Sequence, residues 1–296
     1  MALRPLDNAL PIAAERPKKQ AKIVAPAPKE KQLPDPGVND ENTVPSDASV
    51  DYVPSEKLEA FQDPAAKIQD LVGGLESKDW LKVCESLNDV RRFAIHHSHL
   101  LLPILDKLLL VIVKGMKNPR SALCKTSIMA AADIFKAFGG KLLESTSDAF
   151  NQLLLQLLLK ASQDKKFVCE EADRALSTMV NSIAPLSLLD KLSSYVSHSN
   201  LRVRAKAAIS ISNCVSKMDL KGMEEFGIAK LIKTASNLLN DKLPGAREAA
   251  RGMVVSLYEA TTEGVEDKQE TWQGFCQANL AAIDAQAMVK LVQSSS

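Results

Sequence analysis

The sequence is poor in aromatic residues and has no long hydrophobic run. Rings account for 4% of its 296 residues, with two tryptophans, although the hydrophobic content reaches 46%. The most apolar stretch, residues 100–113, is interrupted by Pro103, Asp106 and Lys107, which excludes a transmembrane helix there. Leu, Ala, Val and Ile therefore carry the hydrophobicity, and such aliphatic residues are typical of closely stacked helices.

Cysteine is also scarce, and its distribution bears on the cellular compartment. The five cysteines are dispersed, with no pair at metal-ligand spacing, and an odd number of scattered thiols fits a reducing compartment. Residues 1–19 have no apolar core of signal-peptide length. The net charge of +1 does not by itself indicate a partner. We therefore expect a soluble, intracellular, cytoplasmic protein.

Motifs that would support catalysis or cofactor binding are missing. The pairs Gly73-Gly74 and Gly139-Gly140 are not followed by Lys-Ser/Thr and follow no predicted strand, so neither forms a phosphate-binding loop. The HExxH, GxSxG and kinase signatures do not occur. We expect no enzyme, no cofactor and no metal site.

Two groups of potential metal ligands remain. The histidine cluster within residues 96–99 has no nearby carboxylate to orient an imidazole, which predicts a solvated helix end. Cys84, Cys124 and Cys169 lie near the starts of successive predicted helices, where stacked repeats would hold them roughly 10 Å apart. Metal ligation needs sulfurs that converge within about 4 Å. Buried structural thiols are therefore expected.

The first 57 residues differ from everything that follows. Nine of the fourteen prolines lie there, so neither a helix nor a strand ladder can propagate. Residues 1–31 hold seven Lys/Arg against three Asp/Glu, whereas residues 32–56 hold six acids and no base. We predict a disordered arm over residues 1–57 and interpret it as a solvated linker. The alternatives are a basic arm that adds affinity for a polyanion and a nuclear-import signal at residues 16–22.

From Leu58 onward the apolar residues recur with the helical period of 3.6 residues. Five segments share one template, a polar turn with a basic residue followed by apolar positions at i, i+4, i+7 or i+8, and i+11. The second template position recurs after 40, 45, 35 and 43 residues, and the mean of about 41 lies within the range of HEAT and armadillo repeats. The template residues are Val83, Leu87, Val90 and Ala94; Leu123, Ser127, Ala131 and Ile134; Val168, Ala172, Leu176 and Met179; Val203, Ala207, Ile211 and Cys214; and Ala246, Ala250, Met253 and Leu257.

A second apolar helix separates successive templates, so each repeat is predicted to be a helical hairpin. These helices are expected at residues 100–116, 147–161, 185–197 and 224–240. Residues 268–292 are expected to form a shortened sixth repeat that caps the stack. The stripe along that segment comprises Trp272, Phe275, Asn279/Leu280 and Ile283. The expected fold class is all-α, an α-solenoid of about five to six HEAT-like hairpins over residues 58–293.

The turns within the hairpins are unusual for their positive charge. Each of five contains a lysine or an arginine, although polar turns often do, and the first also contains Trp80. Because the turns of a solenoid stack side by side, we expect a basic strip along one edge with Trp80 at its end. Trp80 is typical of an aromatic hot spot flanked by charges, and the alternative is a ring folded back onto its own repeat. The turns are residues 77–80, 118–121, 163–167, 199–202 and 241–244.

Four segments resemble a known family. The run LVGGLESKDWLKVCESLNDVRRFA is similar to the first repeat of TOG domains, in which a tryptophan follows an acidic turn residue. The run KNPRSALCKTSIMAAADIFKAFGGKL resembles the matching repeat of CLASP and of the crescerin (TOGARAM) group. The run DKKFVCEEADRALSTMVNSIAP resembles the crescerin type, and LRVRAKAAISISNCV follows the CLASP pattern more loosely. The resemblance extends over residues 70–217 and, more weakly, over 218–293.

The resemblance implies a six-repeat TOG-like paddle that binds an αβ-tubulin heterodimer, or the microtubule lattice, through its intra-repeat turns. Trp80 would match the tryptophan that packs on tubulin, and the basic positions would pair with its acidic surface. A non-enzymatic, monomeric protein of the microtubule cytoskeleton is implied, one that organises or regulates microtubules and has no nucleic-acid or membrane partner. The implied tubulin-binding residues are Lys78, Trp80, Arg120, Lys165, Lys166, Arg202 and Lys242.

The sequence departs from the family pattern in two places. Pro119 stands where the family usually has an apolar residue before Arg120. The fifth and sixth repeats match the family pattern poorly, and this affects the contacts implied with the second tubulin subunit. The rival interpretation is a generic HEAT or armadillo adaptor or scaffold. Importin-like armadillo proteins carry Trp-xxx-Asn pairs, but here Cys84 and Cys276 stand four residues after the two tryptophans. That form of the rival therefore lacks its motif.

Overall fold

The computed structural model describes residues 52–145 and 147–294. The chain divides into two units, Met1–Ser46 and Asp47–Ser296, and the described residues belong to the second. The predicted disordered arm, residues 1–57, therefore lies outside the described residues except for its last six. Those six residues, 52–57, contact the helical unit, and Ser55–Lys57 forms a 3-10 helix, η1. The packed part of the unit thus begins earlier than the expected Leu58.

The described residues fold into helical hairpins and contain no strand. The first helices of successive hairpins are α1 (Pro64–Leu75), α3 (Leu105–Lys117), α6 (Ser147–Ala161), α8 (Pro185–Ser193), α11 (Ile228–Leu239) and α13 (Lys268–Asn279). The second helices are α2 (Trp80–His96), α4 (Ser121–Phe138), α7 (Lys166–Ser182), α9 (Leu201–Val215), α12 (Pro244–Thr261) and α14 (Ala282–Gln293). Short helices connect the hairpins: η2 (Ser98–Ile104), α5 (Lys141–Ser145) and α10 (Leu220–Phe226).

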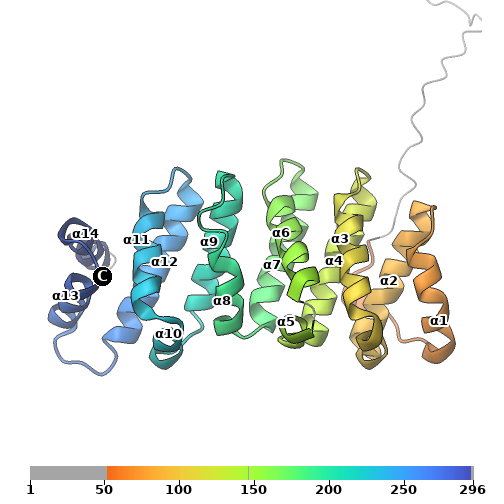
Figure 1. Ribbon diagram of the computed structural model, residues 1–296, viewed down its shortest axis with the longest axis horizontal. Coiled ribbons are helices and arrows are strands. Elements are labelled where there is room, and N and C mark those ends of the chain that lie inside the picture. The colour runs from red at the N-terminus through yellow and green to blue at the C-terminus, as the bar shows by residue number, and fades with distance from the viewer. Residues whose placement is uncertain (1–51, 146, 295–296) are drawn as a thin grey trace, which may run out of the picture. The chain divides into compact units, whose positions relative to one another are not determined.

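The hairpins stand side by side in two layers (Figure 1). α2 packs on α4, α4 on α7, and α9 on α12, so the second helices form one layer. α3 packs on α6 in the other layer. None of the described helices is long and apolar enough to cross a membrane. The predicted all-α solenoid of HEAT-like hairpins is confirmed.

The periodic template accounts for the core between the layers. All twenty template residues are buried, and Leu87, Ala172 and Ala207 have no exposed surface. Four of the five residues at the second template position are Ser or Ala, and such small residues allow close helix crossings. At the crossing of α3 and α4, a Cβ atom added to Gly115 would lie 2.1 Å from the hydroxyl of Ser127. The glycine and the serine together therefore set how closely these two helices approach.

Several predicted helix bounds were wrong, and two of them have a clear local cause. The helix expected at residues 224–240 is broken at Gly227, whose φ of 106° is readily adopted only by glycine. The helix expected at 100–116 begins as the 3-10 helix η2, which contains Pro103. The helix expected at 185–197 ends at Ser193.

The predicted capping segment, residues 268–292, is a hairpin and not a single stripe. α13 ends at Asn279, and Leu280 has extended backbone, so the helical period is lost before α14 begins. Trp272 is 1% exposed, as the stripe requires, whereas Ile283 is 83% exposed. Ile283 was therefore placed wrongly. The sixth hairpin itself is present, as expected, and closes the described part of the stack.

Candidate functional site

The turns within the first five hairpins lie along one edge of the stack. In Figure 1 they form the upper edge, whereas the connecting helices α5 and α10 lie at the lower edge. We call the upper one the turn edge and define it by residues 76–80, 118–121, 162–167, 198–202 and 240–244. All seven implied binding residues lie on this edge, so the structure brings them into one row.

The first turn places Trp80 at the start of α2. The hydroxyl of Ser77 accepts a hydrogen bond from the backbone N–H of Asp79 at 3.1 Å, and the Asp79 carboxylate accepts one from Leu81 N–H at 3.0 Å. This N-cap fixes the helix start, because it satisfies a backbone donor that the helix leaves free. Trp80 is half-buried and packs on the core, while Lys78 is exposed. This partial burial agrees with a ring folded back onto its own repeat, and the interface role of Trp80 stays a prediction.

The second and third turns are joined through their basic residues. Asn118 Oδ1 accepts a hydrogen bond from Arg120 N–H at 2.9 Å, which orders the turn before α4. Lys165 Nζ reaches back from the third turn and donates to Ser121 Oγ at 2.9 Å. Lys166 is exposed and lies 3.8 Å from Glu170 one helical turn later. An exposed i,i+4 pair of this kind contributes only about 0.3–0.5 kcal/mol, so Lys166 is readily available to a partner.

The fourth turn is tied to the third by an ion pair. Arg202 Nη1 lies 2.6 Å from Asp164 Oδ1 and also donates to the carbonyl of Ser162 at 3.2 Å. Asn200 caps α9 by accepting from Arg202 N–H and Val203 N–H. Arg202 is exposed, but its charge is already matched by Asp164. It therefore adds less to a basic strip than its position in the sequence suggests.

The fifth turn is fixed from two sides. Arg204 Nε lies 2.9 Å from Asp241 Oδ2, and Arg247 Nη1 donates to the carbonyls of Asp241 at 2.7 Å and Lys242 at 3.0 Å. The Lys242 side chain is exposed beside a polar cavity of about 470 Å³ that Arg204 and Asp241 also line. Two arginines thus order the backbone that presents Lys242.

Two residues on or next to the turn edge were missed by the sequence analysis. Phe167, at the start of α7, is 42% exposed and follows the two lysines of the third turn. The sequence offered a signal for Phe167, because it lies in the third turn, where the helical period does not require an aromatic ring. Arg204 gave no such signal, since its role depends on Asp241 in the next repeat.

The cysteines and histidines do not assemble a reactive centre in the described residues. No group of three or more His, Cys, Asp or Glu that could hold a metal ion occurs there. Burial raises the pKa of the Cys214 thiol to about 12, and that of Cys276 also to about 12, so these thiols stay protonated. His96 Nε2 hydrogen-bonds to the carbonyl of Leu58 at 2.7 Å, and His97 Nε2 is buried without a partner. His96 and His99 are exposed, as expected for a solvated helix end, whereas His97 is half-buried.

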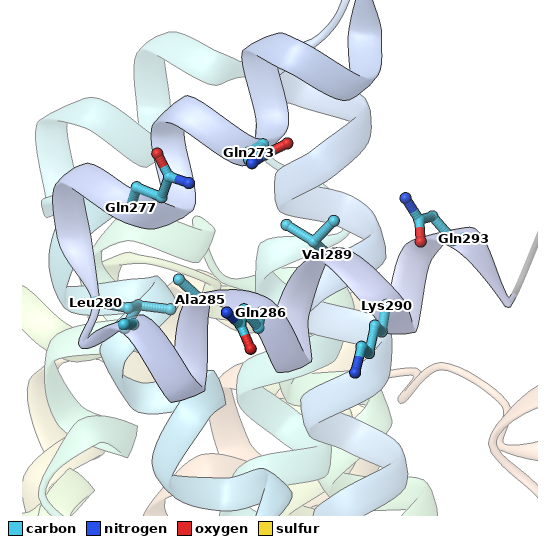
Figure 2. A pocket seen from close by; sticks show the side chains of 9 residues that line it. Gln273, Gln277, Leu280, Ala285, Gln286, Val289, Lys290 and Gln293 are labelled. Atoms are coloured by element: carbon cyan, nitrogen blue, oxygen red, sulfur yellow. The ribbon is translucent and has the colours of Figure 1, made fainter.

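A groove of about 410 Å³ opens between α13 and α14 (Figure 2). Figure 2 shows Leu280, Ala285 and Val289 along it, with glutamine side chains around them. Lys290 is its one titratable lining residue. General acid–base catalysis requires a positioned proton donor or acceptor with a partner to tune it, and this groove does not contain such a pair.

The likeness to known proteins can be stated against this geometry. Residues 89–267 match the family described as CLASP N terminal. The TOG array regulator of axonemal microtubules protein 1 of Mus musculus is 30% identical over 172 residues, 58% of this chain and 10% of that protein. Its Homo sapiens counterpart is 30% identical over 129 residues, 44% of this chain and 7% of that protein. This chain thus spans at most a tenth of the length of the curated relatives it matches.

Solved structures agree on the fold. The TOG domain from C. elegans Zyg9 superposes with a TM-score of 0.57 at 18% identity, covering 81% of this chain and 92% of that one. The MAST/Orbit N-terminal domain gives a TM-score of 0.54 at 16% identity, covering 76% and 96%. The family match extends over more than half of the sequence. The chain therefore belongs to the CLASP N-terminal family, and its helical hairpins have the fold of a TOG domain.

Proposed function

We propose that this chain binds tubulin, as the αβ heterodimer or within the microtubule lattice, and thereby helps to organise or regulate microtubules. The observation that carries the proposal is the turn edge, on which a half-buried Trp80 and exposed lysines and arginines of successive repeats form one row. The family membership supports it, as does the name of the mouse and human relatives, a TOG array regulator of axonemal microtubules. The role is one of binding and not of catalysis.

The row of turns suits a broad acidic surface better than a small ligand. Trp80 offers an apolar anchor at one end, and Arg120, Lys165 and Lys166 follow it along the edge. Hot spots of protein interfaces are enriched in tryptophan and arginine, and exposed cations speed the encounter with an anionic partner. Lys78, Arg202 and Lys242 complete the proposed contact set. We further propose that the chain is a monomer at the cytoplasmic microtubule cytoskeleton. It is proposed to have no nucleic-acid or membrane partner.

The proposed function is tested by co-sedimentation with microtubules together with size-exclusion chromatography with soluble tubulin. We expect the full chain to pellet with microtubules or to elute with the tubulin dimer, and the affinity to fall as salt rises. Exposed charges are screened over about 8 Å at physiological ionic strength, which is the physical reason for that dependence. Protein that stays in the supernatant at saturating microtubules and does not elute with tubulin favours the rival, a generic HEAT or armadillo scaffold.

The arm is proposed to add avidity. Residues 1–31 carry a net positive charge, and a single binding module gains lattice affinity when a second weak contact is linked to it. We expect deletion of these residues to weaken lattice binding more than binding to a single dimer. Equal losses of lattice affinity and of affinity for a single dimer would indicate that the arm acts only as a linker.

A further inference from the structure

The segment before α1 is held along α2 by its backbone. We call residues 52–61 the strap. Arg92 Nε donates to the carbonyl of Glu59 at 2.7 Å, and the Leu58 carbonyl lies 2.7 Å from His96 Nε2. Phe61 packs on Phe93 with ring centroids 4.7 Å apart. The strap is thus attached at several points to the C-terminal half of α2, through Arg92, Phe93 and His96.

The N-terminal half of the strap continues from α2 onto α4. Lys125 Nζ of α4 lies 4.3 Å from the ring centroid of Tyr52, within the range of a cation–π contact. Ser55 Oγ donates to Asp133 Oδ1 of α4 at 2.7 Å. The strap therefore bridges the first two hairpins, whose turns carry Trp80 and Arg120.

A buried ion pair lies beneath this bridge. Arg91 Nε contacts Asp133 Oδ2 at 2.7 Å, and the two side chains are 1% and 2% exposed. Three further donors of Arg91 are used by the Val53 carbonyl at 2.8 Å, by Asn88 Oδ1 at 3.0 Å and by Ser55 Oγ at 3.2 Å. The charges of Arg91 and Asp133 balance each other. The Arg91 donors that face the strap are paired only while Val53 and Ser55 supply neutral acceptors.

The position of Ser55 requires a hydroxyl group with its proton. Asp133 Oδ1 can only accept, so the 2.7 Å contact depends on the Ser55 O–H as donor. A phosphoryl group there would add a charge of about −1.5 to −2 beside a buried carboxylate whose arginine is already paired. Like charges at hydrogen-bond distance repel strongly where water is excluded. A phosphorylated Ser55 cannot keep the observed position.

We propose that Ser55 is a phosphorylation site that releases the strap. A serine kinase would transfer the γ-phosphoryl group of ATP to Ser55 Oγ, with ADP as the leaving group and the hydroxyl proton passing to the kinase base. Ser55 is half-buried between the exposed residues Pro54 and Glu56. The phosphoryl group is therefore transferred while the strap is transiently detached from α2 and α4. Phosphorylation then prevents its return.

Release has a consequence for partner binding, and this part of the inference rests on the proposed function. Without the bridge, α2 and α4 are joined by their direct packing and by the Arg91–Asp133 ion pair, and Tyr52 no longer covers Lys125. Trp80 and Arg120 would then have to be ordered when the partner binds. We expect tubulin affinity to fall at least about fivefold, the lower end of the effect of immobilising two side chains anew.

The test uses the full chain carrying phosphoserine at Ser55, installed during translation, with phosphoserine at Ser187 as the matched control. Ser187 is an exposed residue of α8 outside the strap. Hydrogen–deuterium exchange of residues 52–61 should rise at least tenfold in the Ser55 form and stay unchanged in the Ser187 form. Ser55→Ala, which removes one hydrogen bond but adds no charge, should raise it far less.

Unchanged exchange of residues 52–61 in the Ser55 phosphoprotein would overturn the proposal. An equal rise in the Ser187 form would do the same, because it would show general loosening. A serine kinase that prefers acidic surroundings, incubated with the full chain and ATP, should modify Ser55, and mass spectrometry that finds it unmodified after exhaustive incubation counts against the site. Because exchange is read without tubulin, its failure is distinct from a failure of unmodified protein to bind tubulin.

Discussion

The Arg120 guanidinium carbon lies 5.0 Å from the centroid of the Trp80 ring, so the second turn covers part of the aromatic residue at the end of the turn edge. A contact of this kind contributes about 0.5–1 kcal/mol where it is exposed. The same ring packs on the core of its own hairpin. Trp80 is thus both a structural residue and an accessible one, and mutations there have to be judged on two measurements.

We expect Trp80→Ala to weaken tubulin binding by about 2 kcal/mol, roughly thirtyfold, because an interface anchor is lost. The free energy of unfolding should fall by less than the roughly 3–5 kcal/mol typical of a fully buried ring, because Trp80 is half-buried. Binding is measured by co-sedimentation and stability by urea unfolding. Trp272→Phe is the control, since it changes a buried ring of α13 and should leave binding unaltered. Normal binding by Trp80→Ala would remove Trp80 from the contact set.

Charge reversal of the third turn should separate binding from folding. Lys165→Glu with Lys166→Glu is expected to weaken tubulin binding at least tenfold, because two cations become anions on the proposed contact surface. Both side chains are exposed, and surface substitutions rarely shift stability by more than about 0.5 kcal/mol each. Lys221→Glu with Lys233→Glu changes the net charge equally away from the turn edge. If both double variants lose the same affinity, net charge and not the turn edge determines binding.

The core could be predicted from the sequence because its cause is local. Helical periodicity places Leu87, Ala172 and Ala207 on inward faces whatever the rest of the chain does, and all are buried. The turns could be located for the same reason, since each lies between two periodic segments. The break at Gly227 was missed, because an isolated glycine is tolerated in a helix and only the backbone shows its positive φ.

The strap could not be predicted, because its contacts are distant in sequence. Ser55 and Asp133 are 78 positions apart, and Arg91 and Asp133 are 42 apart. No periodic pattern indicates that a proline-containing segment will lie over a buried ion pair. The composition of the first 57 residues changes from that of the rest of the chain, yet contacts, and not composition, decide where the packed unit begins.

Buried thiols should make the chain less stable in alkali. The pKa values of Cys214 and Cys276 are raised to about 12 in the folded state, whereas an unfolded thiol titrates near 9. The protonated thiols therefore stabilise the fold fully below pH 9, and this contribution is lost as pH rises from about 9 toward 12. The loss approaches about 1.4 kcal/mol per pH unit for each thiol. Urea unfolding between pH 8 and 10.5 checks it, and Cys214→Ala should have a shallower slope than the unaltered chain.

The buried ion pair should respond differently to single and double replacement. Arg91→Met leaves the Asp133 carboxylate buried without its arginine and should lower the free energy of unfolding by about 3–5 kcal/mol. Arg91→Met with Asp133→Leu removes both charges and should restore much of that loss. A double-mutant cycle in urea measures the coupling. Additive losses would show that the pair acts through packing alone.

Stepwise truncation locates the start of the packed unit. The composition of residues 1–57 alone predicts an unpacked arm, whose removal would leave the melting temperature nearly unchanged. The contacts of Val53 and Ser55 with Arg91 and Asp133 now lead us to expect a lower melting temperature for that deletion. Removal of 1–51 is the reference, because it keeps the described contacts of Tyr52, Val53 and Ser55. Removal of 1–61 should be the most damaging, since it also uncovers Phe93. Burying a ring or a leucine contributes about 1.5–3 kcal/mol each, so the loss with Leu58 and Phe61 should exceed 2 kcal/mol.

Scanning calorimetry of the three truncations checks the order, and equal melting temperatures would mean that the strap does not stabilise the first two hairpins.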